Sequence, residues 1–424
     1  MNNFFNKILG IYSKNIKKNH LFENDLKNIE INKIFGSINK FSAKSEIRFV
    51  GGCIRKILNK EQVDDIDLAT NLNPEKLSEC LKKNKINFYD TGIKHGTLTA
   101  TINKKNFEIT SLRKDISTDG RHALVKFSED WYEDAKRRDF TINSIYADYD
   151  GNLFDPFDGK KDLENGKINF IGDADRRIKE DYLRILRYVR FFLNYSKFDH
   201  DPNIKKIIKQ NINGVINLSK ERLIDELKKL VTSNGFININ DDLFCKEILL
   251  LIFPQIKYID VFKKLKKNYR NEIIKKDFIF LLSLLIVDET DNSEFFIYKY
   301  NMSNEDKKRI SFLKDMHDKS NDKNTFSKNN LQKIFYFKGK SFLFDVIDFQ
   351  LFRSNKKNNK LIEIKKYFEK LEKPHFPIKA KIIMEKYKMK ESKELGEKLK
   401  YLENLWVENN FNISEKEVDN AFSI

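Results

Sequence analysis

The chain has 424 residues, enough for two or three domains, and 40% of them are hydrophobic, which is sufficient for folded cores. Its 15 glycines and 6 prolines are too few for collagen-like or low-complexity sequences, and three distant cysteines exclude a disulfide scaffold or a Cys-x-x-Cys metal site. The 80 lysines and arginines exceed the 63 acidic residues by 17, which suits a polyanionic partner such as nucleic acid and equally suits a solvated lysine-rich surface.

No segment of the sequence has the pattern of a signal peptide or a membrane span. The apolar residues at the start are interrupted by Asn and Lys, and the longest apolar run, residues 278–287, predicts a buried helix because it is too short to cross a bilayer. We therefore expect a cytoplasmic protein without a membrane partner.

The predicted elements change character along the chain. Residues 1–45 predict one or two amphipathic helices, and from residue 173 onward helical periodicity continues to the C-terminus. The region between them predicts a mixed sheet with strands at 47–50 and 65–70, a helix at 53–58, and a hairpin formed by 96–102 and 106–113. The predicted fold class is α+β, with a small mixed-sheet head followed by an all-helical remainder.

Two aspartates lie in the second predicted strand. Side chains alternate along a strand, so Asp65 and Asp67 are expected on one face, where two carboxylates repel unless a cation lies between them. Mg²⁺ prefers such oxygen ligands together with phosphate oxygens. The motif alone is weak, because most Asp-x-Asp pairs are solvated strand ends or turns.

The residues around this pair strengthen the interpretation. The first strand ends at Gly51-Gly52, where a phosphate can approach the backbone closely, and Arg55 follows one turn into the helix. The plainer alternative is a glycine turn with a surface arginine. If the predicted hairpin pairs beside the aspartate strand, Glu108 would complete an acidic cluster that could hold a second metal ion or accept a hydroxyl proton.

Eight blocks in a fixed order carry a resemblance to a known family. The chain resembles the class II tRNA nucleotidyltransferase and bacterial poly(A) polymerase family of the polymerase-β superfamily, which includes the CCA-adding enzymes. The blocks are FVGGCIR with DIDLAT (49–70), TGIKHGTLTA (91–100), FEITSLRKD (107–115), DGR (119–121), AKRRDFTINSIY (135–146), LFDPFDGKKDL (153–163), RRIKEDYLRILRYVRF (176–191) and SKERLIDELKKL (219–230).

The resemblance implies an arrangement of domains. It consists of an N-terminal helical segment (1–45), a nucleotidyltransferase head (46–170), a helical neck that selects the nucleotide base (171–232), and a helical body and tail that bind tRNA (233–424). The polar segment 115–127, with Asp119 and Arg121, matches the family's flexible loop, although an ordinary mobile loop fits it as well.

The resemblance also implies residue roles. Asp65 and Asp67 would bind two Mg²⁺ ions, with Glu108 as the third catalytic carboxylate, while an RNA 3′-hydroxyl attacks the α-phosphate of CTP or ATP. The residues expected to bind the nucleotide are Gly51, Gly52, Arg55, Arg138, Asp181, Arg184, Arg187 and Arg190.

Asp181 and Arg184 are expected to select the base. They are predicted three residues apart on one helix and are therefore expected to be neighbours, and an acceptor beside a planar donor can read the Watson–Crick edge of C or A. An amphipathic helix with internal Asp–Arg pairs is the plainer alternative. Arg187 and Arg190 would continue along the same helix toward the triphosphate.

These features predict an enzyme that adds or repairs the 3′-terminal CCA of tRNA from CTP and ATP without a nucleic-acid template, as a monomer or homodimer. A poly(A) polymerase with the same head and a catalytically silent RNA-binding relative are the alternatives. The dipeptides His200-Asp201 and His317-Asp318 match a metal phosphohydrolase signature, but six histidines in the whole chain do not favour such a domain.

Overall fold

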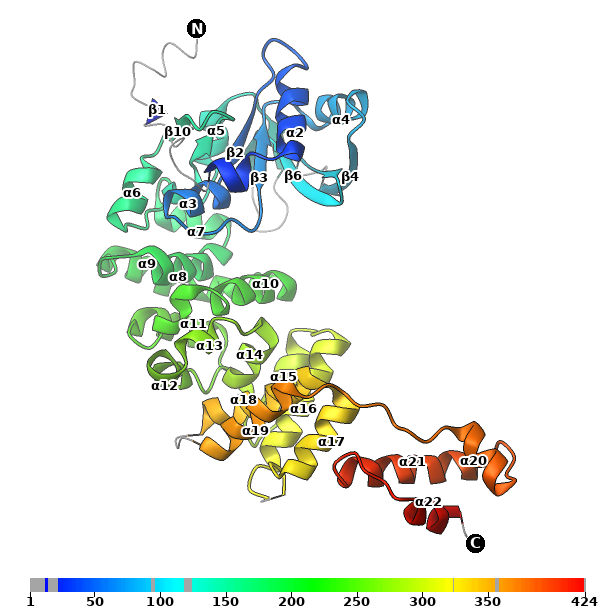
Figure 1. The fold of residues 1–424 in the computed structure, drawn as a ribbon. Helices are drawn as coiled ribbons and strands as arrows, with labels where there is room; N and C mark the ends of the chain where they lie inside the picture. The colour runs from blue at the N-terminus through cyan, green and yellow to red at the C-terminus, as the bar shows by residue number, and fades with distance from the viewer. Residues whose placement is uncertain are drawn as a thin grey trace. The chain divides into compact units, whose positions relative to one another are not determined.

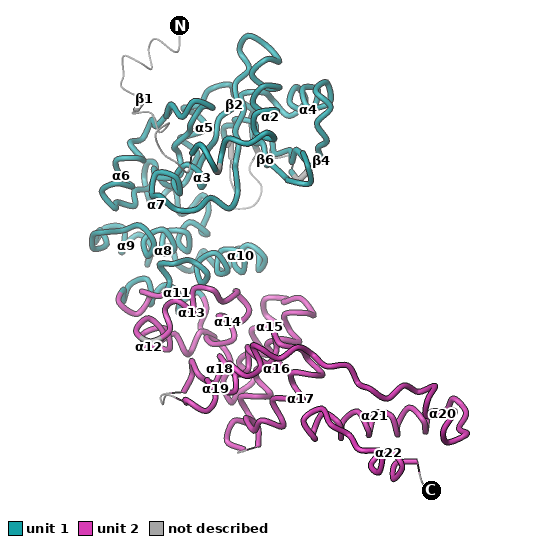
Figure 2. Tube along the Cα trace, in the orientation of Figure 1, with its two compact units in different colours: residues 1–236, 242–252 teal, residues 237–241, 253–424 magenta. Residues whose placement is uncertain are grey.

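The computed structural model describes residues 12–13, 22–92, 96–117, 124–322, 324–354 and 358–422. The chain divides into two compact units, one of residues 1–236 and 242–252, the other of residues 237–241 and 253–424 (Figure 2). The sheet lies in the first unit and the second unit is helical (Figure 1). The α+β fold expected from the sequence is confirmed, whereas the boundaries expected at residues 45, 170 and 232 remain predictions.

The head contains an eight-stranded mixed sheet in the order β1-β10-β9-β2-β3-β6-β5-β4. Its strands are β1 (Tyr12–Ser13), β2 (Ile47–Val50), β3 (Asp67–Thr70), β4 (Asn87–Gly92), β5 (Thr97–Ile102), β6 (Lys105–Ser111), β9 (Tyr146–Ala147) and β10 (Leu153–Phe154). Among the described strands of this sheet, β3 and β6 pair in parallel and the other neighbours are antiparallel. A separate hairpin pairs β7 (Arg113–Ser117) with β8 (Leu124–Phe127).

Both faces of the sheet are covered, because alternate side chains of its strands enter two different cores. Phe49 and Leu68 pack in one cluster with the helices α2 (Ile29–Asn39), α3 (Gly52–Leu58) and α4 (Pro74–Lys83). Val50 and Ala69 enter the other with Trp131 of α5 (Trp131–Lys136). This alternation fixes which side chains of β2 and β3 point to each face.

Most of the elements expected in the head are present. The strand at 47–50, the following helix and the hairpin are confirmed. The hairpin turns at Asn103 and Lys104, which both have positive φ, as in a type I′ turn. The strand expected at 65–70 is shorter, since β3 begins only at Asp67. Asp65 therefore precedes the strand, and the premise that both aspartates alternate along it is wrong.

The helices that follow the head build the rest of the first unit. They are α6 (Gly159–Asn165), α7 (Ala174–Glu180), α8 (Leu183–Tyr195), α9 (Pro202–Asn211), α10 (Lys220–Val231) and α11 (Leu243–Ile252). Short helical turns cover Phe22–Leu26, Thr141–Asn143, Ile212–Asn217 and Asn234–Asn238. Helices α7 and α10 begin at the side-chain caps Asp173 and Ser219, which accept bonds from backbone N–H groups of the first turn.

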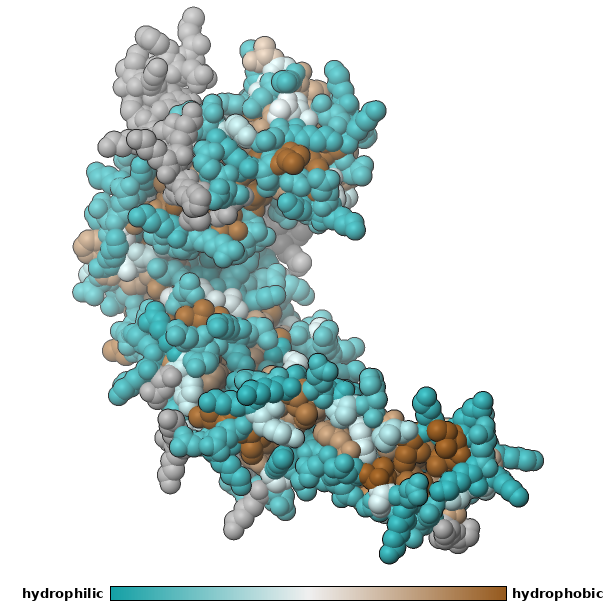
Figure 3. Space-filling view, viewed as in Figure 1, coloured by the Kyte–Doolittle hydropathy of each residue, from teal (hydrophilic) through white to brown (hydrophobic). Residues whose placement is uncertain are grey.

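The second unit is built from α12 (Val261–Asn268), α13 (Arg270–Ile273), α14 (Phe278–Ile286), α15 (Asn292–Lys299), α16 (Asn304–Asp318), α17 (Lys328–Lys338), α18 (Lys340–Arg353), α19 (Asn359–Lys370), α20 (Ala380–Tyr387), α21 (Lys393–Glu408) and α22 (Glu415–Phe422). The apolar run expected as a buried helix is α14, and its residues from Phe280 to Ile286 are buried. Among the described helices, none is both long and apolar enough to cross a membrane. Around α20 and α21, apolar side chains reach the surface over a small separate core (Figure 3).

Candidate active site

The diglycine turn links β2 to α3. Gly51 has a φ of +69°, in the left-handed region that favours glycine, and its N–H donates to the carbonyl of Ile145. A Cβ built on Gly52 would lie 3.9 Å from Arg55 Nη2 and 4.0 Å from Asp67 Oδ2. The turn is therefore placed directly between an arginine and one of the two predicted metal ligands.

Asp65 and Asp67 line the same cleft, although only Asp67 belongs to β3. Both side chains are exposed to solvent in the cleft. Reduced hydration by the surrounding protein raises the pKa of Asp67, and repulsion from Asp65 raises it further. The positive charges of Arg138, Arg55 and Lys229 act in the opposite direction and lower it. A carboxylate in this situation gains from a bound cation.

Glu108 is brought beside Asp67 by the sheet. The parallel pairing of β3 and β6 places the two residues opposite each other, so the pairing on which the acidic cluster depends is confirmed. The Glu108 side chain is exposed and does not line the cleft. Among the described residues, the three carboxylates do not gather within 4.8 Å as a ligand set, so the compact acidic cluster is not formed, and the catalytic role of Glu108 remains a prediction.

The cleft has a volume of about 540 Å³, within the range of small-molecule sites. All the residues expected to bind metal or nucleotide, except Glu108, line it. Its walls carry nine cationic and four acidic side chains, which suits a polyanionic ligand. The lining residues are Gly51, Gly52, Arg55, Lys56, Asp65, Asp67, Arg137, Arg138, Asp139, Asn143, Asp181, Leu183, Arg184, Arg187, Arg190, Phe191, Arg222 and Lys229.

Arg138 is held by a buried carboxylate and a phenol. Its Nε donates to Tyr146 Oη at 2.9 Å and its Nη2 lies 3.2 Å from Asp134 Oδ2. Burial alone would raise the pKa of Asp134, but Arg137 and Arg138 hold it well below its ordinary value. Asp134 therefore fixes two arginines at the wall of the cleft as permanent cations.

A chain of hydrogen bonds connects the diglycine helix α3 to α8. Arg55 donates to Asn143 Oδ1, Asn143 Nδ2 donates to Asp139 at 2.9 Å, and Arg187 Nε donates to Asp139 at 2.6 Å. Burial alone would raise the pKa of Asp139, but Arg187 and the bond from Asn143 hold it well below its ordinary value. Asn143 and Asp139, both in the block AKRRDFTINSIY, thus join two arginines on separate helices.

The arginines of α8 have a second anchor on α10. Arg190 Nε donates to Glu226 at 2.5 Å, and Arg187 Nη1 lies 3.7 Å from the other oxygen of this 2% exposed carboxylate. The guanidinium of Arg190 also lies over the Phe191 ring, 4.2 Å from its centroid, and Arg55 approaches the same ring at 4.7 Å. Three arginines are therefore oriented before any ligand binds.

The pair expected to select the base is arranged differently from the prediction. Asp181 ends α7 with extended backbone, and α8 begins at Leu183, so Asp181 and Arg184 do not share a helix and the premise of helical neighbours is wrong. Arg222 Nη2 donates to Asp181 at 2.7 Å, whereas Arg184 Nη1 lies 3.0 Å from Glu180 and donates to the Arg177 carbonyl at 2.6 Å. Both side chains nevertheless line the cleft.

Several lining residues were not predicted as site residues, although the sequence blocks contain them. Arg137, Asp139 and Asn143 lie in AKRRDFTINSIY, and Arg222 and Lys229 lie in SKERLIDELKKL. Their place in these blocks is the sequence feature by which they could have been identified as site residues. Of the expected flexible loop, Asp119 and Arg121 lie outside the described residues.

Comparisons with known proteins show what the chain is similar to. Residues 47–169 match the family described as the poly A polymerase head domain. The human protein named CCA tRNA nucleotidyltransferase 1, mitochondrial, is 40% identical over 263 residues, which cover 60% of this chain and 61% of that protein. The CCA-adding enzyme of Lactobacillus johnsonii is 38% identical over 192 residues, which cover 45% of this chain and 47% of that enzyme.

The fold is also that of a solved enzyme. The Bacillus stearothermophilus CCA-adding enzyme, crystallised in complex with CTP, superposes with a TM-score of 0.65 at 22% identity, over 91% of this chain and 94% of that chain. The comparisons thus show a poly A polymerase head domain at residues 47–169 and the fold of this solved structure over most of the chain. The chain is similar, over more than the head, to proteins named CCA tRNA nucleotidyltransferase and CCA-adding enzyme, while the family match covers the head alone. Its sequence match spans about three fifths of the human relative and about half of the Lactobacillus one.

Proposed function

We propose that this protein is a tRNA nucleotidyltransferase that adds or repairs the 3′-terminal CCA of tRNA from CTP and ATP without a nucleic-acid template. The carrying observation is that the diglycine turn, two aspartates, the arginines of α8 and Asp181 line one cleft. The names of the relatives, which describe CCA addition to tRNA, support the choice of substrate.

The triphosphate is bound by the cationic wall of the cleft. Gly51 and Gly52 leave the backbone open to close approach, while Arg55 and Arg138 provide fixed charges beside it. Because Asn143, Asp134 and Tyr146 already hold these guanidinium groups, little reorganisation is required when the phosphates bind. These residues orient the α-phosphate for attack by the RNA 3′-hydroxyl, with pyrophosphate leaving.

Asp65 and Asp67 are the residues that hold the divalent cations, which we take to be Mg²⁺. The donor set fits a hard cation, since it consists of carboxylate oxygens, and burial raises the pKa of Asp67, to which Asp65 lies near enough for its charge to add to this effect. When bound, Mg²⁺ neutralises charge on the phosphate oxygens and lowers the pKa of the attacking hydroxyl. Glu108, beside Asp67 in the sheet, is proposed as the third catalytic carboxylate.

Asp181 and Arg184 recognise the base. A carboxylate accepts from the exocyclic amine of C or A, and a guanidinium donates to the neighbouring ring position or carbonyl. In the structure each is paired with a protein group, Asp181 with Arg222 and Arg184 with Glu180. Base binding therefore replaces at least part of these pairings, and U and G, which lack the amine at that position, cannot compensate the loss.

The helices of the second unit are proposed to bind the tRNA through their lysines and aromatic residues. The protein is proposed to act as a monomer or homodimer.

Three cysteines, all free and buried, suit the reducing cytoplasm, where we place the protein. The human relative is named as mitochondrial, so fractionation of the native cells, followed by detection of the protein, tests this placement.

The function is tested with the purified full chain, Mg²⁺, tRNA ending at the discriminator base, and each labelled nucleoside triphosphate in turn. Two C additions followed by one A support the proposal. Long A tails would show a poly(A) polymerase instead, and no incorporation would show an RNA-binding relative without activity.

Variants connect the activity to the cleft. Asp67→Asn is expected to lower incorporation of both nucleotides by about 10³-fold or more, because the cation ligand is removed, while tRNA binding changes little. Asp64→Asn is the matched control, since Asp64 is a nearby exposed aspartate that pairs with Lys56 and does not line the cleft. Equal activity of the two variants would contradict the assignment of Asp67.

A further inference from the structure

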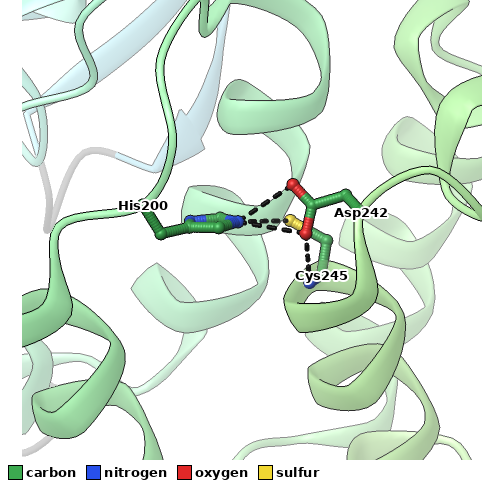
Figure 4. A group of neighbouring side chains, drawn as sticks. All are labelled: His200, Asp242 and Cys245. Atoms are coloured by element: carbon green, nitrogen blue, oxygen red, sulfur yellow. Dashed lines mark hydrogen bonds and ion pairs between the residues drawn. The ribbon is translucent and has the colours of Figure 1, made fainter.

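A second group of chemically reactive side chains lies in the first unit, apart from the cleft. His200, in the loop after α8, meets Asp242 and Cys245 at the start of α11, and the three side chains point toward one another (Figure 4). One ligand atom of each lies within 4.8 Å of the others. Among the described residues, these three form the one group of His, Cys, Asp or Glu side chains close enough together to bind a metal ion. None of the three lines the cleft.

The separations suit a tetrahedral transition metal. His200 Nε2 lies 2.9 Å from Asp242 Oδ2 and 3.7 Å from Cys245 Sγ. Zinc bonds of about 2.0–2.1 Å to nitrogen or oxygen and about 2.3 Å to sulfur place tetrahedral ligand atoms about 3.3–3.6 Å apart. The nitrogen–sulfur separation nearly matches, and the nitrogen–oxygen pair would open by a few tenths of an ångström.

The surroundings fix the histidine with Nε2 facing the other two ligands. Tyr188 Oη lies 3.0 Å from Nδ1 of His200, so this nitrogen can donate to the phenol while Nε2 keeps its lone pair for a metal. The ring of Phe192 stacks on the imidazole with 3.5 Å between centroids, and Phe244 packs against its edge. These contacts orient the ring, so that Nε2 is the nitrogen available to a metal.

A divalent metal would balance the charge of the ligand set once the thiol has lost its proton. Cys245 is fully buried, and an ionised thiolate beside Asp242 would place two negative charges together in a site with low exposure. A divalent metal cancels both charges, and binding releases the thiol proton to solvent. Sulfur, nitrogen and oxygen donors select a borderline metal such as Zn²⁺ rather than Mg²⁺, which prefers oxygen.

We propose that His200, Asp242 and Cys245 form a zinc-binding site, with a water molecule as the fourth ligand. The metal ties the start of α11 to the loop that follows α8. Because α8 also carries Arg184, Arg187 and Arg190, the zinc site braces the helix that contributes three arginines to the cleft. It takes no part in nucleotidyl transfer, and the proposal does not depend on the activity proposed above.

Cobalt(II) is the probe, because a cobalt–thiolate bond gives a near-ultraviolet charge-transfer absorption that oxygen ligands do not. Full-length protein, treated with chelator and dialysed, is titrated with Co²⁺, and Zn²⁺ is then added in competition. We expect a saturable band with one Co²⁺ per chain that Zn²⁺ abolishes. At about 100-fold excess over Kd, Zn²⁺ should also raise the Tm by about 5 °C or more.

Substitutions test whether Cys245 and Asp242 bind the metal. Cys245→Ser should lose the band, whereas Cys80→Ser, a control at another buried free cysteine, should keep it. Asp242→Asn retains a side-chain oxygen that can accept from the Cys245 N–H and cap α11, but should weaken Co²⁺ binding by about tenfold or more. Asp67→Asn should keep the band, which separates this site from the cleft.

Two results would overturn the proposed zinc site. If the wild-type chain shows no band, or if Cys245→Ser keeps it, the cluster is a hydrogen-bonded histidine and helix cap without a metal, and the proposal is overturned. Circular dichroism establishes that each variant is folded. If Cys245→Ser does not fold, His200→Gln and Asp242→Asn provide the decision in its place.

Discussion

Asp181 and Arg222 form an ion pair at the cleft, with Arg222 Nη2 2.7 Å from Asp181 Oδ2. Asp181 lies between two helices, where its backbone is extended, and Arg222 reaches it from α10. The other oxygen accepts from the Leu183 N–H at 3.2 Å. The carboxylate proposed to read the base is thus oriented by α10 and by the start of α8 together.

Removal of this partner should change base choice more than phosphate binding. In Arg222→Met, Asp181 keeps its charge but loses its orientation, so we expect discrimination between CTP and UTP, measured as the ratio of kcat/KM values, to fall by about tenfold. Lys220→Met, at an exposed position of α10, is the control. Unchanged discrimination in Arg222→Met would show that Asp181 needs no such support or does not read the base.

Lys229 should affect the pH at which activity is lost on acidification. Its charge acts to lower the pKa of Asp67, which reduced hydration raises, so Lys229→Met should raise that pKa further. Because Asp67 must be ionised to hold a cation, Mg²⁺ affinity and activity should then be lost at a higher pH as the pH falls. The adjacent exposed Lys228, changed to Met, is the control. Apparent Kd values for Mg²⁺ between pH 5 and pH 8 measure the effect, and identical profiles for both variants would exclude it.

Asp134 should make stability depend on pH. Its pKa is lowered in the folded state, chiefly by Arg137 and Arg138 against the opposing effect of burial, so its stabilisation is present above the ordinary aspartate pKa of about 3.9. That stabilisation is lost as the pH falls toward the lowered value. Asp134→Asn should therefore reduce the free energy of unfolding by about 3 kcal/mol or more at pH 7.

The difference between wild type and Asp134→Asn should shrink as the pH falls below 4. Urea denaturation at pH 7 and at the lowest pH where both proteins remain folded provides the two values. A difference that does not change with pH would mean that Asp134 stabilises the fold by packing and not by its charge.

The sequence predicted those parts of the site that depend on local pattern. Gly51-Gly52 and Arg55 were found because a strand, a turn and a helix are local. The hairpin that carries Glu108 was predicted for the same reason, while its pairing beside the aspartate strand was only a condition of the acidic cluster. The break at Asp181 was missed, since a three-residue spacing fits one continuous helix as well as the end of one and the start of another.

Long-range partners could not be inferred from local pattern. The bond from Arg55 to Asn143 joins residues 88 positions apart, and the pair of Asp181 with Arg222 joins residues 41 apart. The same is true of His200 and Cys245, which helical periodicity alone does not bring together. Such contacts depend on how helices pack, and a sequence pattern gives little information on packing.

Gly159 shows how closely the fold packs around the chain of hydrogen bonds that runs through Asn143 and Asp139. A Cβ at Gly159 would lie 2.1 Å from the Thr141 carbonyl oxygen, in the turn that carries Asn143, so backbone must move to accommodate it. Gly159→Ala should therefore reduce the free energy of unfolding by about 1–3 kcal/mol and should lower kcat/KM as Asn143 shifts away from Arg55.

Gly36→Ala provides the matched control for this change. Gly36 lies within α2, its φ is not positive, and a Cβ there would meet nothing within 4 Å. We expect Gly36→Ala to increase the free energy of unfolding by about 0.5–1 kcal/mol, because alanine restricts the unfolded chain and favours the helix, with no change in kcat/KM. Thermal denaturation and steady-state kinetics measure both variants. Equal behaviour of the two alanines would mean that the turn at Thr141 yields without displacing Asn143, and the proposed coupling between α6 and the cleft would then be wrong.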